Sequence, residues 1–390
     1  MPWDRSEQGN AMAQFATLDT EGKPTQAVRR LLADLIDKGV VEAVLTPARQ
    51  GPGNVVMQTL VSDARKMELA EPLAPVVWTN AGTLVSSLTY NPTGTPVAAV
   101  MRSCEVRAFV ERTKLNQGSR ENLLLIGLDC LGRFENRDYL ALARRHEDLT
   151  AEFLAHAAAG NAEAFDGVHV TNACNACEFP VAPSVDLRLC LIGVDTSREV
   201  VLEALTESGE RALSSLGLPA CEAPSGRGEA TRKLEGERVA FRDALFATYR
   251  EKTATVDGLI EATAACINCY NCRVACPVCY CRECVFTTDL FRHNSSKYLM
   301  WSRKKGMVKM PTDTLFYHLT RMIHMSTMCV GCGQCSSACP NDIDVMEMFR
   351  TTAEDTQARF DYLPGRDFDE KLPMATFHED ELQDVSGPGK

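Results

Sequence analysis

The cysteines of this chain are spaced for iron–sulfur chemistry. The run C-x2-C-x2-C-x3-C-P occurs twice, and bacterial ferredoxins use this run to hold a pair of [4Fe-4S] clusters. A chance match would need eight cysteines and two prolines in register. The first copy comprises Cys266, Cys269, Cys272 and Cys276, and the second comprises Cys329, Cys332, Cys335 and Cys339.

The proline-side cysteine of each run is expected to serve the other cluster, as in two-cluster ferredoxins. This crossing predicts one cluster on Cys266, Cys269, Cys272 and Cys339, and another on Cys329, Cys332, Cys335 and Cys276. Structural zinc is the alternative, but zinc favours paired C-x2-C units. A disulfide framework is also disfavoured, because C-x2-C-x2-C spacing suits a cube of iron and sulfur better.

Four more cysteines lie near the ends of predicted strands in the first half of the chain: Cys104, Cys130, Cys174 and Cys177. Ligands gather at the carboxyl ends of strands in parallel sheets. These thiols are therefore candidates for a third [4Fe-4S] cluster. The alternative is four unrelated buried cysteines, which behave as small apolar residues.

A last group follows the first ferredoxin run directly and consists of Cys279, Cys281 and Cys284. Three adjacent thiols indicate a metal, and a fourth cluster is one hypothesis. Packing, or alternative binding to the neighbouring cluster, is the other. Cys190, Cys221 and His293 are candidates for a fourth ligand, although Cys190 sits in an apolar strand pattern typical of a core residue.

Composition limits the class of protein. The chain has 390 residues, 45% of them hydrophobic, and a formal net charge of −11, which argues against a nucleic-acid surface. No apolar run approaches the roughly 18 residues that a membrane span needs. The first residues lack the apolar core of a signal peptide. We therefore expect a cytoplasmic protein, whose cysteines stay reduced and tend to bind metal.

Periodicity predicts the elements that position these cysteines. Apolar runs predict strands at 40–45, 54–61, 75–78, 96–101, 122–128 and 186–194. Helical spacing occurs at 26–38, 81–88, 105–115 and 138–146. Strands that alternate with helices predict an α/β domain over 26–200.

The rest of the chain has other patterns. We expect a loose arm at 1–25, a helical connection at 201–255 and an acidic docking tail at 361–390. The ferredoxin runs fall in 256–360, where a helix at 312–327 has an apolar side made of Leu315, Phe316, Leu319, Met322 and Ile323. The fold expected is thus an α/β amino-terminal domain followed by a mostly α-helical two-cluster ferredoxin domain.

The cysteine-bearing segments resemble the beta-subunit family of deazaflavin-reducing hydrogenases and formate dehydrogenases. The resemblance rests on MRSCEVRAF at 101–109, IGLDCLG at 126–132, CNACE at 174–178, VDLRLCLIG at 185–193 and CPVCYCREC at 276–284. It covers about 26–200 and 256–385. The chain departs from the family by having serine where proline usually precedes Cys104, and by placing both ferredoxin runs after the first domain.

The resemblance implies a flavin, usually FAD, together with a cluster in the first domain. The flavin would exchange hydride with a soluble carrier and single electrons with clusters. No G-x-G-x-x-G is present, but Asn80, Gly82 and Thr83 open a predicted helix whose N–H groups are candidates for phosphate binding. An ordinary helix start is the alternative. Arg102 is a candidate partner for an anionic flavin, or a surface residue.

These inferences favour an electron-transferring subunit of a larger oxidoreductase, such as a formate dehydrogenase or hydrogenase joined to a heterodisulfide-reductase-like or ferredoxin-type module. The catalytic metal centre would lie on another chain, since nothing here resembles a pterin or nickel site. The main alternative is a flavin-free subunit that only connects two redox proteins. A cluster-based regulator or assembly scaffold is a third class.

Overall fold

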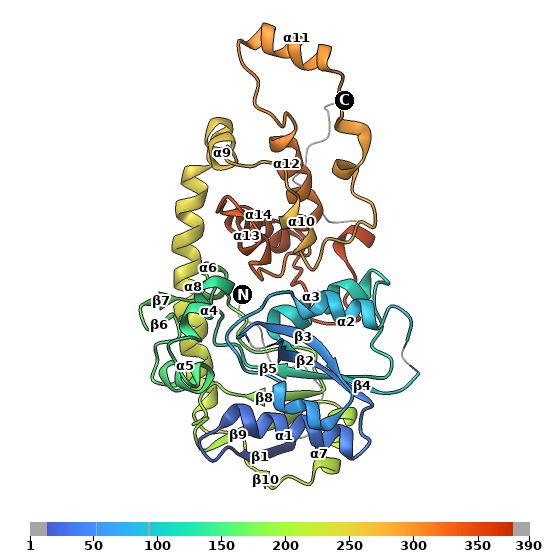
Figure 1. Ribbon diagram of the computed structural model, residues 1–390, viewed down its shortest axis with the longest axis vertical. Helices are drawn as coiled ribbons and strands as arrows, with labels where there is room; N and C mark the ends of the chain where they lie inside the picture. The colour runs from blue at the N-terminus through green and yellow to red at the C-terminus, as the bar shows by residue number, and fades with distance from the viewer. Residues whose placement is uncertain (1–13, 52, 93, 377–390) are drawn as a thin grey trace.

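A computed structural model describes residues 14–51, 53–92 and 94–376 (Figure 1). Its main feature is an eight-stranded mixed sheet in the order β10-β1-β9-β8-β5-β4-β2-β3. The central strands β2, β4, β5 and β8 run parallel, and the outer ones pair antiparallel. The strands are β1 (Gln14–Asp19), β2 (Ala43–Arg49), β3 (Val56–Val61), β4 (Val97–Arg102), β5 (Leu123–Leu128), β8 (Leu187–Cys190), β9 (Glu199–Ala204) and β10 (Ala220–Cys221).

Helices cover both faces of this sheet. One face packs against α1 (Pro24–Asp37) and α7 (Glu207–Leu216), whose leucines join Val100 and Ile126 in one core. The other face packs against α2 (Ala81–Leu88) and α3 (Ser103–Lys114), where Phe109 is fully buried. β4 and β5 are buried at every position, as expected of parallel strands covered on both sides. The predicted α/β arrangement is confirmed.

Smaller elements complete this region. They are η2 (Ala64–Leu69), α4 (Asn136–Leu142), α5 (Leu149–Ala158), the hairpin β6 (Ala164–Phe165) and β7 (Val168–His169), and α6 (Asn172–Asn175). The long helix α8 (Arg227–Lys252) then runs beside the sheet region and up to the second region (Figure 1).

The second region is mostly helical, as predicted, and lies beyond α3 in Figure 1. Buried Arg107 of α3 donates a hydrogen bond of 3.2 Å to the carbonyl of Val330, and Arg112 donates one of 3.1 Å to that of Pro277. The elements are α9 (Val256–Ala262), α10 (Asn271–Val274), η3 (Val285–Thr287), η4 (Asp289–Phe291), α11 (Ser295–Lys305), α12 (Thr314–Met325), α13 (Gln334–Ser337), α14 (Val345–Arg359) and η5 (Pro373–Ala375).

Two predicted segments and one predicted strand differ from the structure. Part of the expected arm, 14–19, is strand β1, and part of the expected helical connection is strands β9 and β10. β1 pairs with β9, 180 to 190 residues away, and with β10, 204 to 206 residues away, and local pattern does not reveal such long-range pairing. Residues 75–78 form no strand, because their carbonyls accept hydrogen bonds from Phe134 and Gln334 rather than from a neighbouring strand. Residues 1–13 of the expected amino-terminal segment lie outside the described residues.

The beginning of the predicted docking tail packs on the chain itself. Tyr362 Oη donates to the Glu111 carboxylate at 2.6 Å, and the Gly365 N–H donates to it at 2.8 Å. Arg107 Nε donates to the carbonyl of Pro364 at 2.8 Å. Residues 362–370 therefore pack on α3, and residues 377–390 of the predicted tail lie outside the described residues. In the described part of the chain, no helix combines the length and apolarity needed to cross a membrane.

Much of the apolar side of helix α12 lies at the surface. Of its five residues, Phe316, Leu319 and Ile323 are exposed, whereas Leu315 and Met322 are partly buried. The buried side carries Tyr317, His318 and Arg321. The physical reason lies in the cysteines that these three side chains contact.

Candidate iron–sulfur centres

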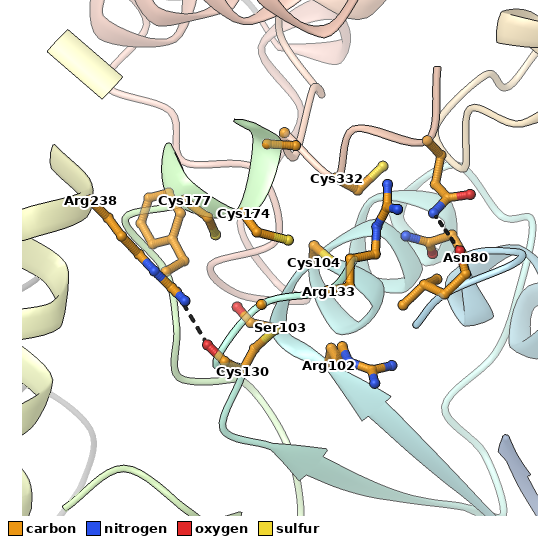
Figure 2. A pocket seen from close by; sticks show the side chains of 16 residues that line it. Asn80, Arg102, Ser103, Cys104, Cys130, Arg133, Cys174, Cys177, Arg238 and Cys332 are labelled. Atoms are coloured by element: carbon orange, nitrogen blue, oxygen red, sulfur yellow. Dashed lines mark hydrogen bonds between the residues drawn. The ribbon is translucent and has the colours of Figure 1, made fainter. Parts of the chain in front are cut away.

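Four cysteines meet in one cavity at the carboxyl edge of the parallel strands (Figure 2). Cys104 lies in the first turn of α3 after β4, and Cys130 follows the end of β5. Cys174 belongs to α6, and Cys177 comes just after it. The cavity has about 480 Å³ of empty space, part of it open to solvent. The structure thus brings together the four thiols proposed as ligands of a third cluster.

The surroundings of these thiols oppose ionisation in the absence of iron. Burial, and next the charge of Cys332, raises the pKa of Cys104 well above its usual range. Burial and the charge of Cys174 raise the pKa of Cys130 to about 11. Burial also raises the pKa of Cys177. Thiols such as Cys104, Cys130 and Cys177 become thiolates together only when a cation replaces their protons, which is how metal ligands behave.

Arginine side chains surround the same cavity. Arg238 of α8 donates a hydrogen bond of 3.2 Å to the carbonyl of Cys130, as Figure 2 shows. Arg133 reaches across to Ser337 of α13 at 2.7 Å. Arg102 is buried, lines the cavity, and donates to the carbonyl of Ala74. The positive charges of Arg102 and Arg238 favour the thiolate of Cys130 and so offset part of the cost of burying a negative cluster.

A second cavity is lined by Cys266, Cys269, Cys272 and Cys339, the four residues that the crossed ferredoxin pattern assigned to one cluster. Cys339 is far from the other three in sequence, so this grouping is a property of the fold. The cavity has about 330 Å³ of empty space. Cys272 is buried, whereas Cys269 is exposed at the surface.

The buried side of α12 faces this second cavity. Arg321 Nη1 lies 3.1 Å from Cys272 Sγ, and Tyr317 Oη lies 3.4 Å from the same sulfur. A ring nitrogen of His318 lies 3.4 Å from Cys266 Sγ, and burial lowers the pKa of His318 to about 4. These three polar side chains explain why this side of α12 is buried. They contact the sulfurs, which an apolar side would leave without hydrogen-bond donors. Sequence reasoning missed them, although their i, i+1, i+4 spacing places them on one helix face.

The remaining ferredoxin cysteines form a third group between the two cavities. Burial, followed by the charge of Cys276, raises the pKa of both Cys332 (to about 12) and Cys335. Burial also raises the pKa of Cys276 to about 11, and the charge of Cys329 adds to this increase. The same Cys332 lines the cavity of Cys104, so this group and the sheet-edge group are immediate neighbours (Figure 2).

Cys279, Cys281 and Cys284 also lie near one another. Burial raises the pKa of Cys279, and the charges of Cys281 and Cys284 add to this increase. Two suggested fourth ligands are wrong, because Cys190 ends strand β8 and packs with Cys221 of β10, so both belong to the sheet region and not to the helical region that holds the three thiols. His293 stacks against Tyr298 and Trp301. The metal role of the three thiols stays a prediction.

The predicted phosphate site at the start of α2 is closed. Its first N–H groups are already bonded, Ala81 N to the Glu105 carboxylate and Gly82 N to Asn80 Oδ1, both at 2.9 Å. A Cβ on Gly82 would lie 2.6 Å from the carbonyl of Glu105, so this glycine serves close packing of α2 on α3. Thr83 N bonds to the carbonyl of Asn80. Asn80, Gly82 and Thr83 therefore form a capped helix start that does not fit a flavin phosphate.

Within the described ranges, no group of three or more His, Cys, Asp or Glu side chains is placed to hold a single metal ion. The cysteines instead line each cavity at separate points. The four thiolates of a [4Fe-4S] cluster are spread in the same way, since each binds a different iron atom. The donor set, the cavities and the nearby cations all fit [4Fe-4S] clusters.

Comparisons with known proteins agree with this geometry. Residues 262–343 match the family model of the 4Fe-4S dicluster domain. F420-dependent formate dehydrogenase 1 subunit beta of Methanococcus maripaludis is 26% identical over 382 residues, covering 90% of this chain and 93% of the relative. The corresponding subunit of Methanocaldococcus jannaschii is 24% identical, covering 87% and 92%.

Among solved structures, a chain of the F420-reducing [NiFe] hydrogenase complex from Methanosarcina barkeri is 13% identical, with a TM-score of 0.44 over 66% of this chain and 97% of that one. The family resemblance drawn from the cysteine segments is confirmed by the sequence relatives. The chain is a homologue of the beta subunits of F420-dependent formate dehydrogenases, and it carries a 4Fe-4S dicluster domain over residues 262–343.

Proposed function

We propose that this chain is the electron-transferring beta subunit of a multi-subunit oxidoreductase of the formate dehydrogenase or hydrogenase type, with its catalytic centre on another chain. The observation that carries the proposal is the shared cavity of Cys104 and Cys332. It makes the sheet-edge site a neighbour of the dicluster region, so the sites form a series rather than isolated centres. When bound, [4Fe-4S] clusters accept and release single electrons over a wide range of potentials.

Three ligand sets make up the series. The first contains Cys104, Cys130, Cys174 and Cys177; the second contains Cys276, Cys329, Cys332 and Cys335; the third contains Cys266, Cys269, Cys272 and Cys339. Hydrogen bonds from side chains fix the position of the sheet region relative to the dicluster region. Gln334 ties α13 to the carbonyl of Val77 at 3.1 Å, and Arg350 of α14 binds the Glu178 carboxylate at 2.8 Å.

A flavin-free connecting subunit is the second candidate, and one observation favours it. The capped start of α2 offers no free N–H groups to a flavin phosphate. Both versions place single-electron transfer in this chain. They differ in whether hydride chemistry with a soluble carrier, such as the deazaflavin F420 named for the relatives, takes place here or on a partner.

Anaerobic purification followed by iron, sulfide and flavin analysis tests the proposal. We expect about twelve irons per chain, four for each cube. Cys104→Ala with Cys177→Ala is expected to remove about four of them and leave the dicluster signals in place. Fewer than about eight irons in the wild-type chain under reconstituting conditions would refute the series. Stoichiometric FAD would select the flavin-containing version, and its absence with intact clusters would select the connecting version.

A further inference from the structure

A helical arm projects from the dicluster region between the two ferredoxin runs. We call residues 290–312, which include α11, the arm. It stands at the end of the molecule opposite the sheet edge strand β10 (Figure 1). None of the cysteines of the two ferredoxin runs lies in the arm, so cluster binding does not account for it.

Nothing in the described chain buries the arm helix. None of the eleven residues of α11 is buried. Isolated helices shorter than about 12–15 residues are marginal in water, and most helical stability in proteins comes from packing. A helix with no packed face is therefore a surface that gains order when a partner covers it.

The charge of the arm is opposite to that of the chain. Residues 290–312 contain six basic side chains and no Asp or Glu, on a chain whose net charge is −11. Three of the basic residues, Arg303, Lys304 and Lys305, are consecutive and exposed at the end of α11. Such local charge of one sign steers an oppositely charged partner and selects against others.

Apolar side chains accompany this charge. Leu290 is 64% exposed, Met307 is 79% exposed and Met310 is 60% exposed. Helix α12 adds what we call the α12 stripe, Phe316, Leu319 and Ile323, the last of which is 75% exposed. Phe316 also contacts Phe291 at a ring separation of 5.8 Å, so the stripe and the arm are joined. Methionine-rich apolar surface within a polar surround is characteristic of protein-binding sites.

The arm and the stripe border the outermost cluster site. Lys309 of the arm donates a hydrogen bond of 2.8 Å to the carbonyl of Cys266. The stripe is backed by the side of α12 that contacts Cys266 and Cys272, so one helix thickness, roughly 10–12 Å, separates it from the thiols. Cys269 of the same site is itself exposed.

We propose that the arm and the α12 stripe form the docking surface for an acidic iron–sulfur protein, which exchanges electrons with the site of Cys266, Cys269, Cys272 and Cys339. The partner's carboxylates meet the basic residues of the arm, and an apolar centre on the partner covers Met307 and Ile323. A protein partner is favoured over a lipid surface, because the surface lies against a redox site whose electrons need another redox centre. The inference rests on the proposed electron-transfer function and names where its partner binds.

The test uses the native complex, purified anaerobically through a tag on this chain. The arm variant is Arg303→Glu/Lys304→Glu/Lys305→Glu. The matched control, Arg137→Glu/Arg232→Glu/Lys233→Glu, reverses three exposed charges on the sheet side of the molecule. Zero-length carbodiimide cross-linking joins arm lysines to partner carboxylates, and mass spectrometry identifies both ends. Rapid mixing measures electron transfer from the reduced chain to the purified partner.

We expect arm lysines of the wild type to cross-link to Asp or Glu of a co-purified iron–sulfur protein. The arm variant is expected to bind that protein at least about tenfold more weakly and to reduce it correspondingly more slowly, with the deficit shrinking as salt screens the repulsion. The control variant should match the wild type. Iron content and the dicluster spectrum should be the same in all three.

Three results would overturn the docking site. They are a wild type that co-purifies with no iron–sulfur protein, an arm variant that keeps its partner and its rate, and arm lysines that cross-link only to a second copy of this chain. Binding of the wild type to phosphatidylglycerol vesicles, abolished by the arm variant while partner retention is unchanged, would assign the surface to lipid instead. In each case an intact iron count leaves the electron-transfer proposal standing, whereas loss of clusters in the wild type would refute that proposal itself.

Discussion

Gly333 allows the two regions to approach each other, and its replacement by alanine is a quantitative test of the cluster series. Gly333 has a φ of +72° and precedes α13, directly after Cys332. A Cβ there would lie well within 3.0 Å of the Cβ of Ala173, a separation that real Cβ atoms essentially never show. Ala173 is buried and precedes Cys174. Gly333 thus sets the distance between the sheet-edge site and its dicluster neighbour.

Gly333→Ala should lower the free energy of unfolding through two separable energy terms. A left-handed φ costs an L-residue roughly 1–2 kcal/mol, and overpacking costs typically about 1–3 kcal/mol. The expected loss in free energy of unfolding is therefore about 2–5 kcal/mol. Gly217→Ala is the matched control, because Gly217 has a φ of +68° and a Cβ added there would meet nothing within 4 Å, so only the first term applies.

Ala173→Gly isolates the second term, which is the cost of overpacking against Ala173. The double variant Ala173→Gly/Gly333→Ala removes the clash but keeps the φ cost, so the two changes should couple favourably by about 1–3 kcal/mol. Anaerobic urea denaturation of the cluster-loaded variants measures the free energies. EPR power saturation measures the magnetic coupling between the two neighbouring clusters, which should weaken in Gly333→Ala and recover in the double variant. Equal costs for Gly333→Ala and Gly217→Ala, with unchanged coupling, would refute the close approach.

Three other predictions rest on single contacts. Cys339→Ala should remove about four irons and the EPR signal of the outermost cluster, whereas Cys276→Ala should remove the irons and the signal of the neighbouring cluster. Iron analysis and EPR measure both, and loss of the opposite cluster in each variant would disprove the crossing. Arg321→Gln, which removes the cation beside Cys272, should lower that cluster's reduction potential by an amount on the order of 100 mV in a redox titration, and an unchanged potential would count against the contact. Hydrogen bonds to two carboxylates raise the pKa of His146. The stability that this residue adds is therefore present below its unfolded pKa and lost as pH rises through its folded pKa. His146→Gln should flatten this pH dependence of the melting temperature in thermal melts.

Part of this site was predictable because its rules are local or topological. The crossing that puts Cys339 with Cys266 follows from ferredoxin spacing alone. The gathering of Cys104 and Cys130 follows from their places after parallel strands, since such ends meet at one sheet edge. Both predictions needed only cysteine spacing and the order of the strands, and the structure places the cysteines of the two cavities accordingly.

Other features were not predictable because they depend on groups that a sequence pattern does not contain. The apolar side of α12 is visible in the sequence, but it does not reveal that sulfurs occupy the neighbouring core and that Tyr317, His318 and Arg321 therefore turn inward. Gly82 looked like a residue that opens a phosphate site, but packing of α2 on α3 requires it. Strand β1 was missed because its partners lie far away in sequence.

Arg321 also shows how one side chain ties the dicluster sites together. It contacts Cys272 of the outer site, and the charges of Cys272, Cys276 and Cys335 all help to raise its pKa, although burial opposes them. The guanidinium therefore lies close to both ligand sets. A cation shared in this way stabilises the more negative, reduced form of both clusters, so it shifts their potentials in the same direction. A difference in potential between them must therefore come from features that the two sites do not share. These include the contacts of Tyr317 and His318 with the outer site, the exposure of Cys269 there, and the burial of the Cys335 thiol at the other site.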